Sequence, residues 1–340
     1  MARPARFWIL ILAIIQRIPV KIETAVLSCR ALPEVLARQI YWRFPLLQDL
    51  YGRMRRTQPK TTKYLDLNHL AKEFGKAGIQ KGACLMVHSS TSGIGLLNNG
   101  KAIDNQLQVA SELLKFLRSA IGPTGTLLMP THPYYRDDPG FKFDKTDLRL
   151  TYDPVRTPSK VGLLTEIFRR SPGAIRSRHP LSSVTAAGPL GELIIGGFPE
   201  TGDLPHGRNS AYKRFCDAGG FVVGINVPLI NALTIVHVAE ELRDGDWPVE
   251  NFFYERTFNV VEGADTVTAI VRERHPKWVK SISLNTLRKD LKRNGLIAER
   301  IVDGINIGFA DGPGVVNHML MRSANSTYPY FFIRRTRDHG

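Results

Sequence analysis

The chain has 340 residues, of which 43% are hydrophobic and 23% are charged, and its formal net charge is +15. This is the composition of a globular protein with a large core, built as one large α/β domain or two smaller ones. No apolar run reaches the roughly 18 residues of a membrane-spanning helix. Three scattered cysteines, Cys29, Cys84 and Cys216, are too few for a disulfide framework or a structural zinc site.

More than half of the excess positive charge lies in residues 1–60, which hold eleven Lys/Arg and three Asp/Glu, a net charge of +8. A nucleic-acid-binding protein carries its basic patch over the fold, so we expect no nucleic-acid partner. This segment mixes an apolar run at 7–15 with cations and aromatics, a mixture typical of peripheral contact with a membrane surface. A helical extension that packs on the main domain explains it equally well. No small-residue cleavage site closes the apolar run, which argues against a signal peptide.

The chain divides by composition into three parts. Residues 1–60 are a basic and apolar N-terminal extension, residues 64–322 are the main domain, and residues 323–340 are a basic tail. In the main domain, apolar periodicity predicts helices at 68–77, 102–119, 160–170, 231–242, 284–296 and 315–321, the fourth of them with Asn231 as its N-cap. Short apolar runs predict strands at 83–87, 126–129 and 220–227, and further strand patterns follow at 258–261 and 266–271. Residues 136–158 have the composition of a long surface loop that borders a site.

Strands that alternate with helices indicate an α/β sheet covered by helices on both faces. In such a sheet the site lies at the carboxyl ends of the strands. Polar residues follow three of the predicted strands here: Ser89 and Ser90, then Thr131 and His132, then the loop before Asn231. The sequence therefore predicts a site at this edge of the sheet.

Two stretches carry residues that can move protons. In the first, at 176–183, His179 precedes a proline and is surrounded by hydroxyls and cations. In the second, Thr234, His237 and Glu240 follow at helical spacing and so share one face of the predicted helix. A carboxylate beside an imidazole fixes the tautomer of the ring and makes it a better base. His237 and Glu240 are only two ligands, so we expect no metal site.

Taken in order, these segments resemble the aminoglycoside 3-N-acetyltransferase family, the antibiotic N-acetyltransferases, from about residue 65 to about 320. The matching blocks are His88-Ser89-Ser90 with Ile94-Gly95, then Gly122-Pro123-x-Gly125-Thr126, Tyr152-Asp153-Pro154, Arg176-Ser177-x-His179-Pro180-x-x-Ser183, Gly207-x-x-Ser210 and Thr234-x-x-His237-x-Ala239-Glu240. The chain departs from the family where Ser210 is followed by alanine rather than the usual proline.

The resemblance implies a three-layer α/β/α sandwich around a mixed sheet, which transfers an acetyl group from acetyl-coenzyme A to an amine of an amino sugar by direct attack. It implies His179, His237 and Glu240 as catalytic residues, without deciding which histidine is the base. Coenzyme contacts are expected from Ser89, Ser90, Gly93, Gly95, Arg176 and Ser183, and acceptor contacts from Thr131, Asn231 and Thr234. No metal is expected in this reaction.

The acceptor class stays open between an aminoglycoside and a precursor of a surface polysaccharide. A polycationic aminoglycoside favours a strongly negative pocket, whereas this chain is basic. We therefore expect a cytoplasmic enzyme at the inner face of the membrane, with peripheral contact through residues 1–60. Two other hypotheses remain: a serine hydrolase that uses Ser89 or Ser90 with His237 and Glu240, although the Gly-x-Ser-x-Gly pattern is missing, and a non-catalytic, membrane-associated binding protein.

Overall fold

The computed structural model describes residues 25–41, 43, 44, 47, 62–135, 150–197, 203–247, 251–275 and 282–324. The chain forms two compact units. The larger unit contains Pro59–His275 and Asn294–Val316, and the smaller unit contains Met1–Gln58, Pro276–Arg293 and Asn317–Gly340. The apolar run at 7–15 and residues 325–340 of the predicted tail lie outside the described residues. The domain boundaries near residues 60 and 322 remain predictions.

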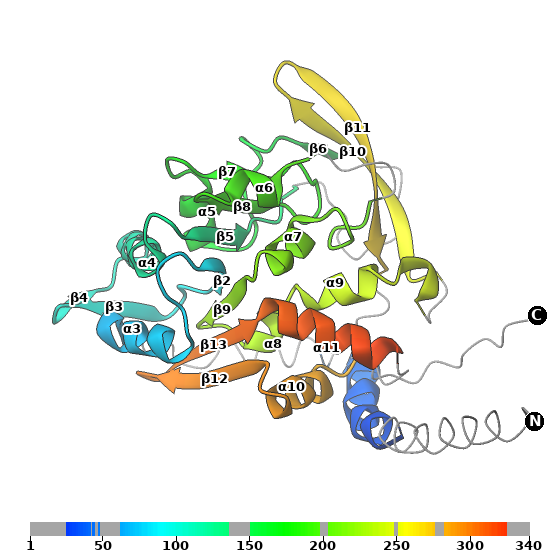
Figure 1. Ribbon diagram of the computed structural model, residues 1–340, viewed down its shortest axis with the longest axis horizontal. Helices are drawn as coiled ribbons and strands as arrows, with labels where there is room; N and C mark the ends of the chain where they lie inside the picture. The colour runs from blue at the N-terminus through cyan, green and yellow to red at the C-terminus, as the bar shows by residue number, and fades with distance from the viewer. Residues whose placement is uncertain are drawn as a thin grey trace, which may run out of the picture. The chain divides into compact units, whose positions relative to one another are not determined.

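A mixed seven-stranded sheet forms the centre of the larger unit (Figure 1). Its strands, in spatial order, are β12 (Ile297–Val302), β13 (Ile305–Asp311), β9 (Phe221–Ile225), β2 (Cys84–Ser89), β5 (Thr126–Pro130), β8 (Val184–Ala187) and β7 (Ile175–Arg176). The central strand β2 pairs in parallel with β5 and with β9, while the outer pairs are antiparallel. The carboxyl ends of β2, β5 and β9 therefore meet at one edge of the sheet.

Two three-stranded sheets complete the larger unit. One contains β1 (Lys63–Asp66), β3 (Ile94–Asn98) and β4 (Lys101–Ile103), and the other contains β11 (Asp265–Arg274), β10 (Phe253–Glu262) and β6 (Leu150–Tyr152). The strands predicted at 258–261 and 266–271 are confirmed as parts of the longer hairpin β10–β11. Of the loop expected at 136–158, residues 136–149 lie outside the described residues and residues 150–152 form β6, whose partner β10 is about a hundred residues away along the chain.

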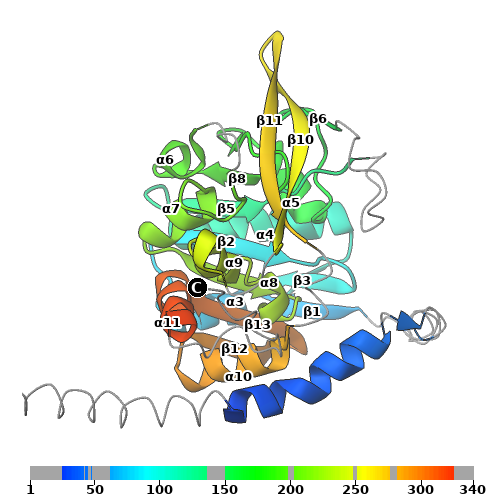
Figure 2. The ribbon, with the colours of Figure 1, turned by 90° about the vertical axis from the view of Figure 1, so that its right-hand side faces the viewer.

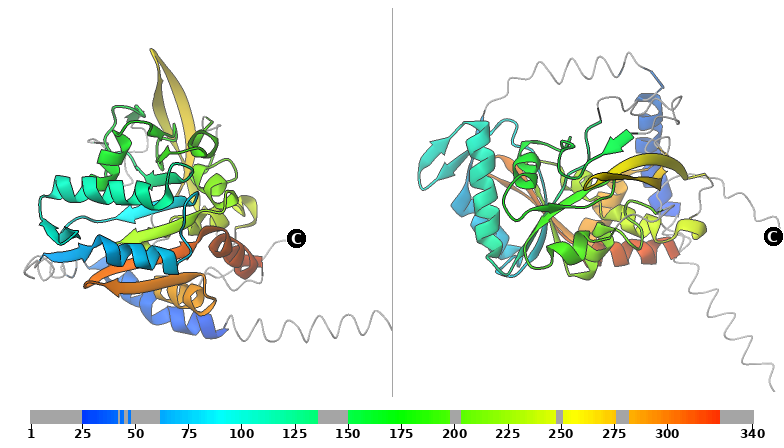
Figure 3. Two further views of the ribbon diagram at one scale, coloured as in Figure 1. Left: turned by 60° about the vertical axis from the view of Figure 1, so that its left-hand side comes forward. Right: turned by 90° about the horizontal axis from the view of Figure 1, so that it is seen from above.

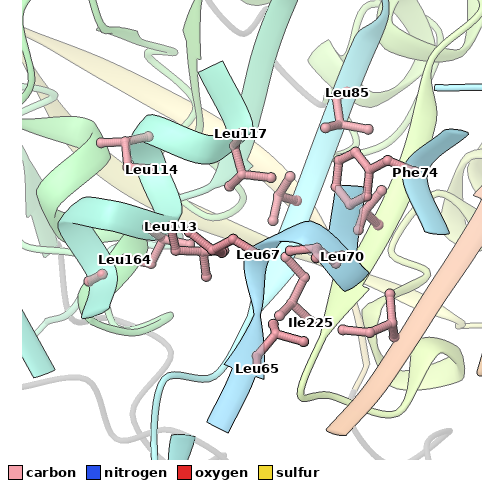
Figure 4. Close-up of a cluster of buried hydrophobic side chains, with 14 of the residues drawn as sticks. Leu65, Leu67, Leu70, Phe74, Leu85, Leu113, Leu114, Leu117, Leu164 and Ile225 are labelled. Carbon is pink, nitrogen blue, oxygen red and sulfur yellow. The ribbon is translucent and has the colours of Figure 1, made fainter. Parts of the chain in front are cut away.

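Helices cover both faces of the central sheet, as the three-layer prediction requires (Figure 3). On one face, α3 (Leu67–Lys76), α4 (Gln106–Ile121) and α5 (Leu163–Arg169) bury leucines and phenylalanines against alternate residues of β2, β5, β9 and β13 (Figure 4). On the other face lie α6 (Gly191–Ile195), α7 (Ala211–Asp217) and α8 (Leu229–Ala232). Gly224 and Gly308 are register partners here, and each lacks the Cβ that would meet Leu229 of α8.

Two predicted helices differ from the observed ones. The helix expected from residue 102 begins only at Gln106, because the Asn105 side chain caps it by accepting from the N–H groups of Leu107 and Gln108 and because Lys101–Ile103 form β4. The single helix expected at 231–242 is divided into α8 and α9 (Val236–Glu241), so Asn231 lies inside α8 and is not an N-cap. The turn between them is closed by a hydrogen bond from Thr234 N–H to Ala232 O.

The smaller unit is helical. Residues 25–41 form a helix that lies beside α10 (Leu284–Arg293), and the unit also includes α11 (Gly312–Ala324) from Asn317 onward (Figure 2). Glu34 caps α10, accepting from Ser283 Oγ and from the N–H groups of Leu284 and Asn285. Asp290 is buried and pairs with His318 and Arg322 of α11. Across the described ranges, no helix is long and apolar enough to span a membrane.

Candidate active site

A cluster of histidines lies in the larger unit, near the carboxyl ends of β2 and β5. His88 belongs to β2, and His132 follows β5 by two residues. Three further histidines join them from distant parts of the chain: His179 from the segment between β7 and β8, His206 from the turn before α7, and His237 from α9. This is the edge of the sheet at which the polar strand ends predicted a site.

His206 is at the centre of this cluster. Its ring centroid is 4.4 Å from that of Tyr212 and 5.2 Å from that of His237. The Tyr212 hydroxyl lies 3.2 Å from His132 Nε2. After burial, which is the larger cause, the proximity of His206 lowers the pKa values of His132 and His179, each to about 3. These rings are therefore neutral at pH 7.

Glu241 holds His206 in one orientation. Its carboxylate accepts from the backbone N–H of His206, and its Oε1 lies 3.0 Å from the ring Nδ1. Because a carboxylate only accepts, Nδ1 carries the proton and Nε2 carries the lone pair. That Nε2 is buried and has no hydrogen-bond partner among the described residues. The sequence does not predict this pair, because only the fold brings residues 206 and 241 together.

His237 pairs with Glu240, as the helical spacing predicted. Nδ1 of His237 lies 2.7 Å from Glu240 Oε2, and Glu240 is almost completely buried. The structure adds Arg274, the last residue of β11, which sequence reasoning missed: its Nη1 lies 2.8 Å from Glu240 Oε2 and its Nη2 lies 2.9 Å from His237 Nε2. Burial lowers the pKa of His237, Arg274 lowers it further, and Glu240 opposes this shift.

His179 has the opposite tautomer. Its Nδ1 accepts hydrogen bonds from the backbone N–H groups of Leu181, at 3.2 Å, and Ser182, at 3.3 Å. The ring proton of the neutral form is therefore on Nε2, a buried atom without a partner among the described residues. In this orientation His179 can donate a hydrogen bond, but its lone pair is not available to accept a proton.

His179 lines a cavity of about 220 Å³, together with residues from the start of α7 and from the end of α6. Asp203 and Arg178 bring opposite charges to its wall. The volume is below the ~300–1,000 Å³ of a typical small-molecule site. The cavity therefore suits one ring or one arm of a larger substrate.

The predicted coenzyme loop after β2 is held in place by its backbone. Ser90 N–H donates to Ile225 O at 3.0 Å, and the Asn226 side-chain amide donates to the carbonyls of Ser90 and Ser92. Gly93 has φ +74° and open space where a Cβ would stand, so a ligand can approach the backbone there. Gly95 lies inside β3, where a Cβ would meet the Tyr64 ring and Ile103 O. The need for glycine at 95 is therefore explained by packing.

Arg176, which is expected to contact the coenzyme, is hydrogen-bonded to other groups of the protein. Its guanidinium donates to Ser183 Oγ at 3.0 Å and to the carbonyls of Pro154, Thr157 and Thr131. Ser183 Oγ also donates to Thr131 O, at 2.7 Å. These contacts explain the cationic side chain without a phosphate, so coenzyme binding by Arg176 and Ser183 remains a prediction that the geometry does not favour.

The three residues expected to contact the acceptor differ in burial and in their distance along the chain from His237. Thr131 is completely buried, with its hydroxyl 3.0 Å from that of Thr185, which suits a structural role. Asn231 is exposed in α8, and Thr234 stands in the turn before α9, three residues from His237. Among the described residues, no group of three or more His, Cys, Asp and Glu side chains could hold a metal ion.

Comparisons with known proteins agree with this geometry. A family model described as aminoglycoside 3-N-acetyltransferase matches residues 86–320. Aminoglycoside N(3)-acetyltransferase III of Acinetobacter baumannii is 35% identical over 179 residues, which cover 50% of this chain and 58% of that protein. Aminoglycoside N(3)-acetyltransferase VII of Streptomyces paromomycinus is 32% identical over 188 residues, covering 52% and 60%. The chain thus matches less than two thirds of the length of these relatives.

Solved structures share the fold over a longer range. AAC-IIIb in a binary complex with CoASH superposes with a TM-score of 0.63 at 20% identity, covering 77% of this chain and 97% of that one. A variant of the aminoglycoside acetyltransferase AAC(3)-IVa in complex with a gentamicin gives a TM-score of 0.60 at 22% identity, covering 82% and 93%. At these identities the likeness establishes the fold.

Proposed function

Since this chain belongs to the aminoglycoside 3-N-acetyltransferase family, we propose that it transfers an acetyl group from acetyl-coenzyme A to an amine of an amino sugar. The observation that carries the proposal is the pair of carboxylate-held imidazoles, His237 with Glu240 and His206 with Glu241, at the carboxyl edge of the sheet. An ammonium group is not a nucleophile, so a base has to remove its proton first. The free amine attacks the thioester carbonyl of acetyl-coenzyme A, the C–S bond breaks, and coenzyme A leaves as a thiolate that takes up a proton.

His237 is the proton acceptor in this proposal. Glu240 keeps the ring proton on Nδ1, so the lone pair is on Nε2. Arg274 contacts that same Nε2. In this proposal the acceptor amine displaces Arg274, which contacts both ring nitrogens, from Nε2. Arg274 meanwhile favours the neutral ring, which is the form that accepts a proton.

His179 acts as a hydrogen-bond donor. Because its Nδ1 accepts from Leu181 and Ser182, the proton on Nε2 is available to an oxygen in the adjoining cavity. A neutral donor placed before the reaction stabilises the negative charge that develops on the acyl oxygen. The question that the sequence left open is thereby answered in the proposal: His237 is the base and His179 the donor.

The loop Ser89–Gly93 is the proposed contact for the coenzyme, because its backbone is fixed and Gly93 leaves room for a ligand. Gly95, Arg176, Ser183 and Thr131 have packing or hydrogen-bonding partners within the protein, and their predicted ligand contacts stay predictions. Thr234 remains the proposed acceptor contact beside His237.

The acceptor class and the location are proposed from charge. The net charge of +15 favours an amino sugar that carries phosphate, such as a nucleotide-linked or lipid-linked precursor of a surface polysaccharide, over a polycationic aminoglycoside. The +8 of residues 1–60 favours a peripheral position at the inner, anionic face of a membrane.

The first experiment is calorimetric titration of acetyl-coenzyme A into the wild type and into His237→Ala and His179→Ala. We expect all three to bind, and both variants to lose thioester consumption in the presence of an amine. Absence of binding to the wild type would overturn the proposal. Labelling of Ser89 or Ser90 by a covalent serine probe would support a hydrolase instead, and tight binding without turnover would support a binding protein. A panel of aminoglycosides and phosphorylated amino sugars then decides the acceptor class.

A further inference from the structure

The helix of residues 25–41 has two apolar faces, although a helix on the surface of a protein needs one. Leu27, Ala31 and Val35, four residues apart, are buried. On the opposite side, Leu32, Leu36 and Ile40 are also four residues apart, and they are 39%, 48% and 52% exposed. Because the residues within each set are four apart, each set lies along one side of the helix.

The exposed set extends beyond these three residues. Val26 precedes it, while Phe44 and Leu47 continue it, each between 42% and 51% exposed. Phe44 N–H donates to Ile40 O, and Leu47 N–H donates to Phe44 O. Single exposed leucines are common on soluble proteins. A row of six large apolar side chains along one face indicates a contact surface.

The helix cannot turn to bury this row within its own unit. Glu34, on the buried side, caps α10 through three hydrogen bonds and also pairs with Arg38. Rotating the helix would break these contacts and expose Leu27 and Val35. The exposed row is therefore a fixed surface.

Charge identifies the occupant of this surface. Arg43 stands three residues after Ile40, on the same side of the helix, and Arg30 stands four after Val26; both are exposed. Residues 1–60 as a whole carry +8. A second copy of the chain would bring two such segments together, which repel, whereas an anionic lipid surface attracts them. Apolar residues with arginines along one helix face are the pattern of a helix that lies in the membrane interface.

We propose that Val26, Leu32, Leu36, Ile40, Phe44 and Leu47, the apolar face, insert into the headgroup region of an anionic bilayer and hold the protein there. The inference specifies the surface for the membrane position proposed above and is independent of acetyl transfer. Arg30 and Arg43 lie at headgroup depth and pair with lipid phosphates.

The test uses the full chain and vesicles of equimolar phosphatidylcholine and phosphatidylglycerol, without coenzyme or acceptor. The double variant Leu36→Gln/Ile40→Gln removes apolar surface and leaves the charge unchanged. Its matched control is Leu107→Gln/Leu193→Gln, at two leucines of the larger unit that are 60% and 69% exposed. Binding is read by co-sedimentation, and self-association is read by sedimentation velocity without lipid.

We expect the wild type and the control to bind the vesicles, and the apolar-face variant to bind at least about tenfold more weakly, because two large apolar side chains are lost from the contact. Added salt weakens the binding of the wild type. The inference is overturned if the wild type does not bind, or if the apolar-face variant binds as well as the control. Wild-type dimers that dissociate in the apolar-face variant, with vesicle binding unchanged, would assign the surface to a second copy.

Discussion

Glu241 accepts two hydrogen bonds from His206, one from the backbone N–H and one from the ring Nδ1 at 3.0 Å. A residue held twice by one buried carboxylate has a fixed position and a fixed tautomer. The result is a lone pair on His206 Nε2 that points into the protein, 5.2 Å ring to ring from the proposed base, His237. We propose that His206 relays the proton from His237 once the substrate is bound.

We expect His206→Asn to lower kcat about 10²-fold, at the lower end of the range for acid–base groups. The asparagine amide nitrogen occupies the position of Nδ1 and keeps the bond to Glu241, while the Nε2 lone pair is lost. The KM for acetyl-coenzyme A should stay unchanged, and circular dichroism should report a native fold. Steady-state kinetics with a wild-type kcat would contradict a role for His206 in proton transfer.

Burial is the main cause that lowers the pKa of His237, and the Arg274 guanidinium lowers it further. In Arg274→Met the pKa rises, so protonation of His237 begins at a higher pH. The acidic limb of the kcat/KM profile should then move to higher pH, because a positive neighbour no longer disfavours the protonated ring. Arg272→Met is the matched control, because Arg272 is on the same strand and pairs with Asp244. Equal shifts in the two variants would argue against a direct effect on His237.

His179→Leu should reduce kcat through loss of the Nε2–H donor, by about 10²-fold if it faces the acyl oxygen. Since burial keeps the pKa of His179 at about 3, the ring does not titrate in the working range. The pH profile of the variant should therefore keep the shape of the wild-type profile at a lower level. An acidic limb that disappears in His179→Leu would instead identify His179 as the titrating base.

Buried histidines make stability sensitive to acid. Burial lowers the pKa of His88 to about 4, and its Nε2 has no partner among the described residues. Above the unfolded pKa near 6.5, neither state binds a proton and His88 has no effect. Below pH 6.5, the His88 ring becomes protonated in the unfolded state. In the folded state it stays neutral until the pH falls to about 4.

The unfolding free energy should therefore drop between pH 7 and pH 5, with His88 accounting for about 2 kcal/mol of the loss. Urea unfolding of the wild type and of His88→Gln at pH 7 and pH 5 measures the contribution of His88. We expect the difference between the two pH values to be smaller in the variant than in the wild type. If this difference is the same in the variant and the wild type, the His88 ring becomes protonated in the folded protein without loss of stability.

Glu34 connects the N-terminal helix to α10 through the helix cap. Glu34→Ala should destabilise the smaller unit by less than about 1 kcal/mol, the usual cost of losing a cap, because Ser283 still accepts from Thr286 N–H. Hydrogen exchange of the amides of Leu284 and Asn285 should accelerate, while exchange in the larger unit is unaffected. Gln39→Ala, an exposed position on the same helix, is the control. Equal exchange in both variants would mean that the cap contributes nothing.

The sequence predicted correctly those features that depend on neighbouring residues. Apolar runs located the buried strands around Leu85, Leu127 and Val222, since parallel strands that are covered on both faces are apolar throughout. The pairing of His237 with Glu240 followed from their separation of three residues on a helix. The long helix from Asn231 was wrong because the bonds that close the turn at Thr234 leave no periodic signature.

Other features depend on chain segments that only folding brings together. Arg274 reaches His237 from the end of a hairpin, and Glu241 reaches His206 across 35 residues. Arg176 has the composition of a phosphate ligand but lies among four oxygens of the protein itself. Edge strands such as β7 are too short for an alternating pattern to identify them.

The sequence by itself therefore determined the α/β class, the family, the edge of the sheet that bears the candidate site and one acid–imidazole pair. These follow from local periodicity and from the order of short motifs. Only the tertiary structure showed which groups surround each histidine nitrogen, and which apolar face of the N-terminal helix stays exposed. Tautomers and exposure depend on the atoms packed around a side chain, and those atoms come from segments that are distant in the chain.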